Sequence, residues 1–182
     1  MKCLVRFSQS GFITVNFATT LLLLSLECHG NAQDYLAGVR AGGSFENGNF
    51  QQAEAFGGVY LPWQFGSKSG FSLRLRVEAS AGFLDSHGDA GFIGTTGPVL
   101  ELRKGNFPVT LDAGVNLTAL SRYNYEDRNL GGWFQFTDHV GLNWHITKHF
   151  TVGWRFQHMS NAGIYKANPG LNQMMLSTSY SF

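Results

Sequence analysis

The segment "FSLRLRVEASAGF", residues Phe71–Phe83, alternates strictly between apolar side chains and polar or small ones. Its odd-numbered positions are all apolar, whereas its even-numbered positions carry Arg74, Arg76 and Glu78. A period of two residues indicates a β-strand whose two faces meet different environments. The same alternation recurs in "VTLDAGVNLTAL" (109–120) and "FQFTDHVGLNWHI" (134–146). These segments predict an all-β chain.

About eight such segments follow residue 33, and they predict an eight-stranded antiparallel up-and-down transmembrane β-barrel. The expected strands are residues 34–46, 52–65, 70–85, 90–104, 107–122, 131–146, 150–160 and 171–182. Short turns are expected at 66–69, 104–106 and 147–149, and longer connections around Asn47, around Ser86, at 123–130 and at 162–170. Alternating short and long connections are typical of a barrel with one periplasmic and one external rim.

The polar face of these strands is charged. It carries Arg74, Arg76, Glu78, Glu101, Arg103 and Asp112. A soluble barrel such as a lipocalin would hide its apolar face inside, whereas a small membrane barrel fills its narrow interior with ion pairs. We interpret the charges as lumen residues that pair and seal the barrel. We likewise interpret His139 and His145 as hydrogen-bonded lumen residues rather than metal ligands.

The first 32 residues resemble a secretory signal peptide, with basic residues before an apolar stretch and small residues at Gly30 and Ala32. We expect residues 1–32 to be removed and residues 33–182 to form an outer-membrane barrel domain. A retained membrane anchor is the alternative. Both cysteines lie within this leader, so the mature chain would contain no disulfide and no thiol nucleophile.

The charge and the last strand indicate the partners. A net charge of +1, with no basic run among aromatics, excludes a nucleic-acid partner. The chain ends in "LSTSYSF", whose alternation and terminal Phe182 resemble the signal that the outer-membrane barrel assembly machinery recognises. We therefore expect a Gram-negative outer-membrane barrel, surrounded by outer-membrane lipids. Whether it forms a homodimer stays open.

The expected strand 150–160, "FTVGWRFQHMS", places two polar residues in its apolar row. His158 and Ser160 continue the alternate positions occupied by Val152, Trp154 and Phe156. A polar side chain facing lipid loses hydration and is costly unless it has a use. With a periplasmic N-terminus, the odd-numbered strands run outward, so both residues lie beside the outer leaflet. The expected substrate is therefore a lipid of that leaflet, lipopolysaccharide.

The stretch "HMSNAG", followed by "NPG" at 168–170, resembles the signature of the lipid A 3-O-deacylases of the PagL family. That signature is His-x-Ser-Asn near the end of the penultimate strand of an eight-stranded outer-membrane barrel. The resemblance is specific from His158 onward and covers the rest only as barrel architecture. It implies a serine esterase that hydrolyses the 3-O-linked hydroxyacyl chain of lipid A. Because no cluster of spare carboxylates accompanies the His158–Ser160 pair, we expect no metal and no cofactor.

The resemblance also implies roles for individual residues. Ser160 would be the nucleophile and His158 its general base, because serine attacks an ester only when a base takes its proton. Asn161, the backbone N–H of Gly163 and Asn168 would stabilise the oxyanion or shape the site. The alternative is that these three residues only shape a tight loop.

The chain departs from the family pattern at the residue that orients the histidine. The family has a glutamate twelve residues after the serine, where this chain has Asn172. An asparagine oxygen can accept a hydrogen bond from an imidazole, but it carries no full charge. A bulge-free hairpin at 147–149 also pairs Asp138 with His158 on the outward face. We favour Asn172, with Asp138 as the alternative, and expect Asn172→Glu to keep or raise activity.

Two other functions stay open. A non-catalytic structural or adhesive barrel explains everything except a serine and a histidine in the lipid-facing row. A different lipid-acting barrel, such as a phospholipase or palmitoyl transferase, explains that row as well. Mass spectrometry of lipid A from expressing cells would separate the three. The sequence does not predict which acyl lengths are accepted or how activity is regulated.

Overall fold

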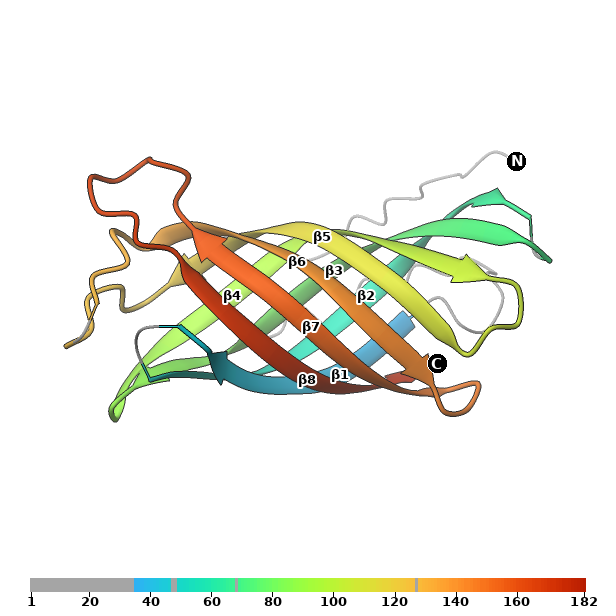
Figure 1. Ribbon diagram of the computed structural model, residues 1–182, viewed down its shortest axis with the longest axis horizontal. Coiled ribbons are helices and arrows are strands. Elements are labelled where there is room, and N and C mark those ends of the chain that lie inside the picture. The colour runs from blue at the N-terminus through green and yellow to red at the C-terminus, as the bar shows by residue number, and fades with distance from the viewer. Residues whose placement is uncertain (1–34, 47–48, 68, 127) are drawn as a thin grey trace, which may run out of the picture.

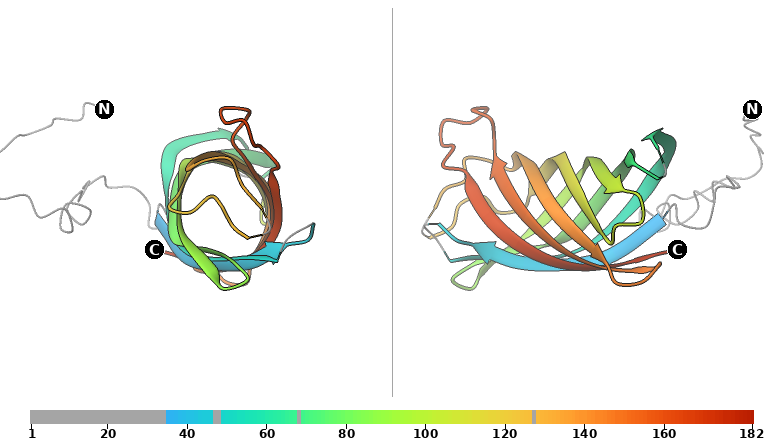
Figure 2. Two further views of the ribbon diagram at one scale, coloured as in Figure 1. Left: turned by 90° about the vertical axis from the view of Figure 1, so that its left-hand side faces the viewer. Right: turned by 45° about the vertical axis from the view of Figure 1, so that its right-hand side comes forward.

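The computed structural model describes residues 35–46, 49–67, 69–126 and 128–182, which form one closed antiparallel barrel of eight strands (Figures 1 and 2). The strands are β1 (Tyr35–Ser44), β2 (Phe50–Gly66), β3 (Phe71–Ser86), β4 (Asp89–Lys104), β5 (Val109–Leu120), β6 (Phe134–His145), β7 (Phe150–Ser160) and β8 (Leu171–Ser181). Each strand pairs with its neighbours in sequence, and β8 closes on β1. The predicted eight-stranded barrel is therefore confirmed, while the expected signal peptide lies outside the described residues.

No helix in the described part of the chain is long and apolar enough to cross a membrane. We call the rim formed by the β1–β2, β3–β4, β5–β6 and β7–β8 connections the outer rim. It lies at the end of the barrel opposite Phe182, as Figure 1 shows.

The connection around Ser86 differs from the prediction. Only His87 and Gly88 separate β3 from β4, so this connection is short. Both residues have positive φ angles, 54° and 87°, as a two-residue hairpin turn requires to match the twist of its strands. The Asp85 carboxylate accepts a hydrogen bond from the Gly88 N–H at 3.3 Å and supports the turn. Short and long connections therefore do not alternate strictly.

β5 and β6 are also shorter than expected, for local reasons. Pro108 has no N–H to donate, and its carbonyl accepts a hydrogen bond from His145 just before β5 begins. At the start of β6, the Gln135 amide donates to the carbonyls of Leu130 and Gly132, at 3.0 and 2.8 Å. These bonds hold the end of the β5–β6 loop in a turn rather than in the sheet.

The alternation within each strand matches the two faces of the barrel. On β3, Arg76 and Glu78 are buried at 4% and 2% exposure, whereas Val77 and Phe83 on the opposite face are 45% and 61% exposed. The exposed side chains form an apolar outer surface, and the buried ones fill the lumen. The predicted assignment of the apolar face to the outside is confirmed.

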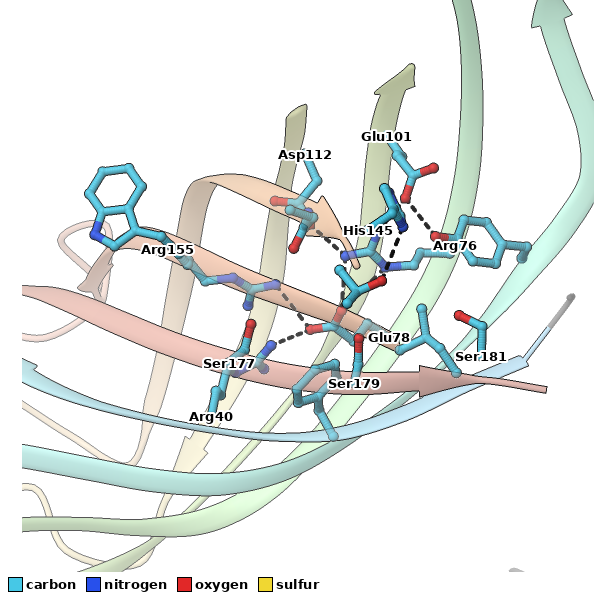
Figure 3. A pocket seen from close by; sticks show the side chains of 16 residues that line it. Arg40, Arg76, Glu78, Glu101, Asp112, His145, Arg155, Ser177, Ser179 and Ser181 are labelled. Carbon is cyan, nitrogen blue, oxygen red and sulfur yellow. Dashed lines mark hydrogen bonds and ion pairs between the residues drawn. The ribbon is translucent and has the colours of Figure 1, made fainter. Parts of the chain in front are cut away.

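The predicted pairing of lumen charges is confirmed at the centre of the barrel (Figure 3). Glu78 binds Arg40 at 2.6 Å, Arg76 at 3.2 Å and Arg155 at 3.3 Å. Arg40 also pairs with Glu54, Arg76 with Asp112 at 2.7 Å, and the Tyr60 hydroxyl donates to Glu101 at 2.6 Å. Because the charged groups among them are buried, each charge depends on its partners.

The two lumen histidines behave differently. His145 lies within hydrogen-bonding distance of Arg103, Thr110 and Thr151, as predicted. His139 is buried in the lumen as predicted, but both of its ring nitrogens lack a hydrogen-bond partner among the described residues, so the expected hydrogen bonding was wrong. Its ring lies over Gly114, where a Cβ would come within 2.6 Å of the ring Cε1, and it fills space there. The described residues contain no group of three or more potential metal ligands.

Apolar side chains close the outer end of the lumen. This apolar plug consists of Phe50, Leu84, Ile93, Leu120, Tyr125, Leu130, Met159 and Leu171. Tyr125 and Leu130 come from the β5–β6 loop, which folds across the barrel opening in Figure 2. Met159 enters the plug from β7 and lies between His158 and Ser160 in sequence. The outer end of β7 therefore has a rigid apolar support on its inner side.

Replacing Glu78 by glutamine is expected to lower the free energy of unfolding by about 3–5 kcal/mol, because three buried arginines lose the charge that they share. Urea denaturation in detergent micelles, followed by tryptophan fluorescence, measures the change. Glu126→Gln, on the exposed part of the β5–β6 loop, is the matched control and should stay within about 0.5 kcal/mol of the wild type. Equal midpoints for the two variants would contradict the structural role of Glu78.

Candidate active site

The candidate site lies at the outer end of β7. His158 and Ser160 occupy the same outward row as Val152 and Trp154, and both are half-buried. The expected placement of this polar pair on the apolar outer surface is confirmed. Ser160 Oγ makes no hydrogen bond with any described residue, so its hydroxyl is not committed to a structural contact.

His158 lies between Asp138 on β6 and Asn172 on β8. The sheet pairs His158 directly with both residues, so the register expected from the short β6–β7 hairpin is confirmed. His158 Nδ1 lies 2.7 Å from Asn172 Oδ1. Asp138 is exposed and makes no hydrogen bond or ion pair within the described ranges. The imidazole is therefore hydrogen-bonded to Asn172 and not to Asp138.

This contact determines the protonation of the ring. An amide oxygen can only accept a hydrogen bond, so His158 Nδ1 must carry the proton that Asn172 Oδ1 receives. In the neutral imidazole, Nε2 then keeps its lone pair and is free to act as a base. The geometry thus leaves an imidazole nitrogen with a free lone pair two residues from a hydroxyl on the same face of the strand.

The loop after β7 is organised around Asn161, which is fully buried. Its side-chain NH₂ donates to the carbonyls of Leu130 and Ala167, at 3.2 and 2.8 Å. Its side-chain oxygen accepts from the backbone N–H groups of Gly163 and Tyr165, at 3.0 and 3.4 Å. In this arrangement both Asn161 and the Gly163 N–H are already used to hold the loop.

Asn168 is arranged differently. Its side-chain oxygen accepts a hydrogen bond from the Asn161 N–H at 3.0 Å, which orients the amide group. Its NH₂ group makes no hydrogen bond with the described residues, and the side chain is exposed. Of the three residues expected to stabilise an oxyanion, Asn168 is the one with an uncommitted side-chain donor.

Gly170 lies against the imidazole. Its φ angle is 67°, and a Cβ at this position would come within 2.8 Å of His158 Cε1. Both the backbone conformation and the close approach require glycine. The Gly170 carbonyl accepts a hydrogen bond from Arg128 of the β5–β6 loop at 3.1 Å. Gly170 of the "NPG" turn thus packs against the imidazole, and Arg128 of the β5–β6 loop holds Gly170 in place.

The structure adds Glu46, which sequence reasoning missed. This residue follows β1, and its carboxylate accepts a hydrogen bond from Asn172 Nδ2 at 2.7 Å. The two residues are 126 positions apart and meet only because β8 pairs with β1. No local sequence signal connects them. Arg128 was missed for the same reason, whereas Gly170 belongs to the quoted "NPG" motif.

The arrangement contains the parts of a serine hydrolase. It provides a hydroxyl, an imidazole with a free nitrogen, a group that orients the imidazole, and an amide donor nearby. His158 and Ser160 are not hydrogen-bonded to each other in the described structure. Such bonds commonly form only when a substrate closes the site.

The chain resembles known proteins along most of its length. The family model described as "Lipid A 3-O-deacylase (PagL)" matches residues 52–181. "Lipid A deacylase PagL" of Bordetella bronchiseptica is 40% identical over 72 residues, which are 40% of this chain and 40% of that protein. The protein of the same name from Pseudomonas aeruginosa is 33% identical over 66 residues, which are 36% of this chain and 38% of that protein.

These curated relatives are therefore matched over well under half of their own length. A solved structure described as the crystal structure of the outer membrane enzyme PagL superposes with a TM-score of 0.71 and 19% identity, covering 81% of this chain and 99% of that one. At this identity the superposition shows a shared barrel fold. The family match includes the candidate site from Asp138 to Asn172, and the chain belongs to the lipid A 3-O-deacylase (PagL) family.

Proposed function

We propose that this protein is a lipid A 3-O-deacylase, a serine esterase of the Gram-negative outer membrane. It removes the 3-O-linked hydroxyacyl chain from lipid A in the outer leaflet. The observation that carries the proposal is the His158–Asn172 hydrogen bond of 2.7 Å beside the uncommitted Ser160, on the apolar face of a PagL-family barrel. The outward position lets a membrane lipid reach the serine by lateral diffusion, without entering the lumen.

In the proposed reaction, Ser160 Oγ attacks the ester carbonyl carbon while His158 Nε2 takes the hydroxyl proton. The tetrahedral intermediate collapses when the ester C–O bond breaks, and His158 returns the proton to the departing oxygen 3 of the sugar. Water, activated by the same nitrogen, then hydrolyses the acyl-serine and releases the hydroxy acid. Protein side chains supply every proton transfer.

Asn168 supplies the proposed oxyanion donor. Its oriented NH₂ group is uncommitted, whereas Asn161 and Gly163 hold the loop in which it lies. A donor of this kind stabilises the negative charge on the carbonyl oxygen of the intermediate. Asn161 and Gly163 therefore act in this proposal by shaping the site.

The apolar row below the site suits an acyl chain. Trp154 and Phe156 continue the row of His158 on β7, and Met174 and Leu176 continue that of Asn172 on β8. These side chains lie within the lipid-facing surface, so a chain attached to lipid A remains in an apolar environment while its ester reaches Ser160.

Export and assembly belong to the same proposal. Residues 1–32 would direct secretion as a removed signal peptide, and residues 33–182 would form the outer-membrane domain. The outer-membrane barrel assembly machinery would recognise the last strand. Its end is ordered in the folded barrel, where the Phe182 N–H donates to the Tyr35 carbonyl at 2.9 Å.

A different lipid-acting barrel is distinguished by its product. A 3-O-deacylase releases a 3-hydroxy fatty acid from lipid A, a phospholipase releases fatty acid from phospholipid, and a palmitoyl transferase adds an acyl chain. A structural or adhesive barrel leaves both lipids unchanged. Mass spectrometry of lipid A and phospholipid from expressing cells therefore tests the proposed function.

Ser160→Ala and His158→Ala should each lower release of the hydroxy acid by about a thousandfold or more, because the nucleophile or its base is lost. Purified protein in detergent, with excess chelator and lipopolysaccharide, provides the assay. Both side chains lie outside the lumen, so the heat-modifiable band of the folded barrel should remain. Wild-type turnover in Ser160→Ala would show that Ser160 is not the nucleophile. A requirement for calcium would contradict the metal-free mechanism.

Asn172→Ala is expected to reduce kcat by about 10- to 100-fold, because the imidazole loses the acceptor that orients it. Asp138→Asn is the matched comparison on the other flank, and its effect should stay within about threefold. Steady-state kinetics on purified lipopolysaccharide measure both. A severe loss confined to Asp138→Asn would assign the orienting role to the aspartate.

Gly170→Ala should lower kcat by about 100-fold, because its Cβ displaces the imidazole on which proton transfer depends. Gly88→Ala is the control, since Gly88 also has a positive φ angle but nothing lies within 4 Å of the added carbon. The two variants share the backbone strain and differ in the contact with His158. Similar kinetics in both would show that the approach of Gly170 is unimportant.

A further inference from the structure

Asn172 forms a hydrogen bond on each side of its amide group. Its oxygen lies 2.7 Å from His158 Nδ1, and its nitrogen donates to Glu46 Oε2, also at 2.7 Å. The carboxylate, the amide and the imidazole therefore form one continuous chain of hydrogen bonds. Glu46 is the only member of this chain that carries a full negative charge when the imidazole is neutral.

Barrel closure and an aromatic contact bring Glu46 to this position. β1 pairs with β8 so that Ser44 lies opposite Gln173, next to Asn172, and Figure 1 shows the end of β1 beside the start of β8. Phe45 packs against Phe156 on β7, with ring centroids 5.7 Å apart and planes at 44°. This contact reaches across β8 and holds the residue before Glu46 against the same outward surface.

The carboxylate determines which way the amide faces. An asparagine side chain can present either its oxygen or its NH₂ group to a neighbour, and only the oxygen accepts the Nδ1 proton of a histidine. A carboxylate can only accept, so Glu46 selects the orientation with NH₂ toward itself and oxygen toward His158. In the reverse orientation, Nδ1 would accept a hydrogen bond and the proton of the neutral imidazole would lie on Nε2. Nε2 would then have no lone pair with which to act as a base.

We propose that Glu46 is a positioning residue of the deacylase site and supplies its negative charge through Asn172. This inference rests on the proposed function. A charge transmitted through a polarised amide favours the imidazolium that forms when His158 takes the serine proton. Glu46 precedes residue 52, where the family match begins.

The proposal changes the expectation for Asn172→Glu. From the sequence, a glutamate at this position should keep or raise activity. With Glu46 beside it, the new carboxylate would face a second carboxylate, and two like charges at this distance disfavour each other. Asn172→Glu should therefore impair the site until the charge of Glu46 is removed.

The test measures kcat and KM for release of the hydroxy acid by the full-length barrel and three variants: Glu46→Gln, Asn172→Glu and the double variant. In the wild-type background Glu46→Gln should lower kcat about tenfold, the loss of a charge-assisted hydrogen bond, with KM within about twofold. In the Asn172→Glu background the same substitution should raise kcat about tenfold. This reversal of sign is the expected signature of the charge.

Glu126→Gln is the matched control, because it neutralises another exposed carboxylate of the outer rim that makes no hydrogen bond in the described structure. It should leave kcat unchanged in both backgrounds. The heat-modifiable band measures the folded fraction of every variant, and kcat is expressed per folded barrel. A loss of folding is thereby separated from a loss of activity.

The outcomes separate the inference from the function on which it rests. If the wild type releases no hydroxy acid from lipopolysaccharide, the proposed function fails, and the inference fails with it. If the wild type is active and Glu46→Gln matches Glu126→Gln, only the role of Glu46 is overturned. If Glu46→Gln lowers kcat in both backgrounds, Glu46 acts by holding the loop, and the charge proposal is overturned as well.

Discussion

The pairing of β8 with β1 is the contact on which the rest of the molecule depends. It runs from Leu36 opposite Ser181 to Ser44 opposite Gln173 and leaves the barrel without an open sheet edge. In a membrane, where water cannot satisfy backbone groups, an unpaired edge would be prohibitive. Closure also brings the end of β1 beside the start of β8. The candidate site is assembled there, at the outer rim, where Glu46 meets Asn172.

The closed barrel has a lumen that is too full to hold a substrate. Buried ion pairs centred on Glu78 fill its middle, and the apolar plug closes its outer end. Chemistry on a lipid must therefore take place on the outer surface. Met159 shows how β7 serves both purposes, because its side chain belongs to the plug while the residues on either side of it face outward. The plug gives the proposed catalytic pair a rigid support.

The candidate site draws on elements from the whole length of the chain. β7 presents the histidine and the serine, β8 presents Asn172, and the β7–β8 loop places Gly170 against the imidazole. Arg128 from the β5–β6 loop and Glu46 after β1 add the outer contacts. In our proposal, asparagine can stand where the family pattern has glutamate, because the Glu46 carboxylate after β1 accepts a hydrogen bond from it.

The sequence by itself determined the strands, their faces and the local pairing of β6 with β7. Alternation identifies a strand and its lipid-facing side from adjacent residues, and a short hairpin turn sets the partner of each residue, as with Asp138 and His158. The "HMSNAG" and "NPG" motifs likewise lie close together in sequence, at the end of β7 and in the β7–β8 connection. Only the tertiary structure shows that the His139 ring nitrogens have no hydrogen-bond partner among the described residues, that an apolar plug forms, and that Asn172 meets Glu46. These features depend on which distant strands and loops meet around the closed barrel, and periodicity along a single strand carries no information about that meeting.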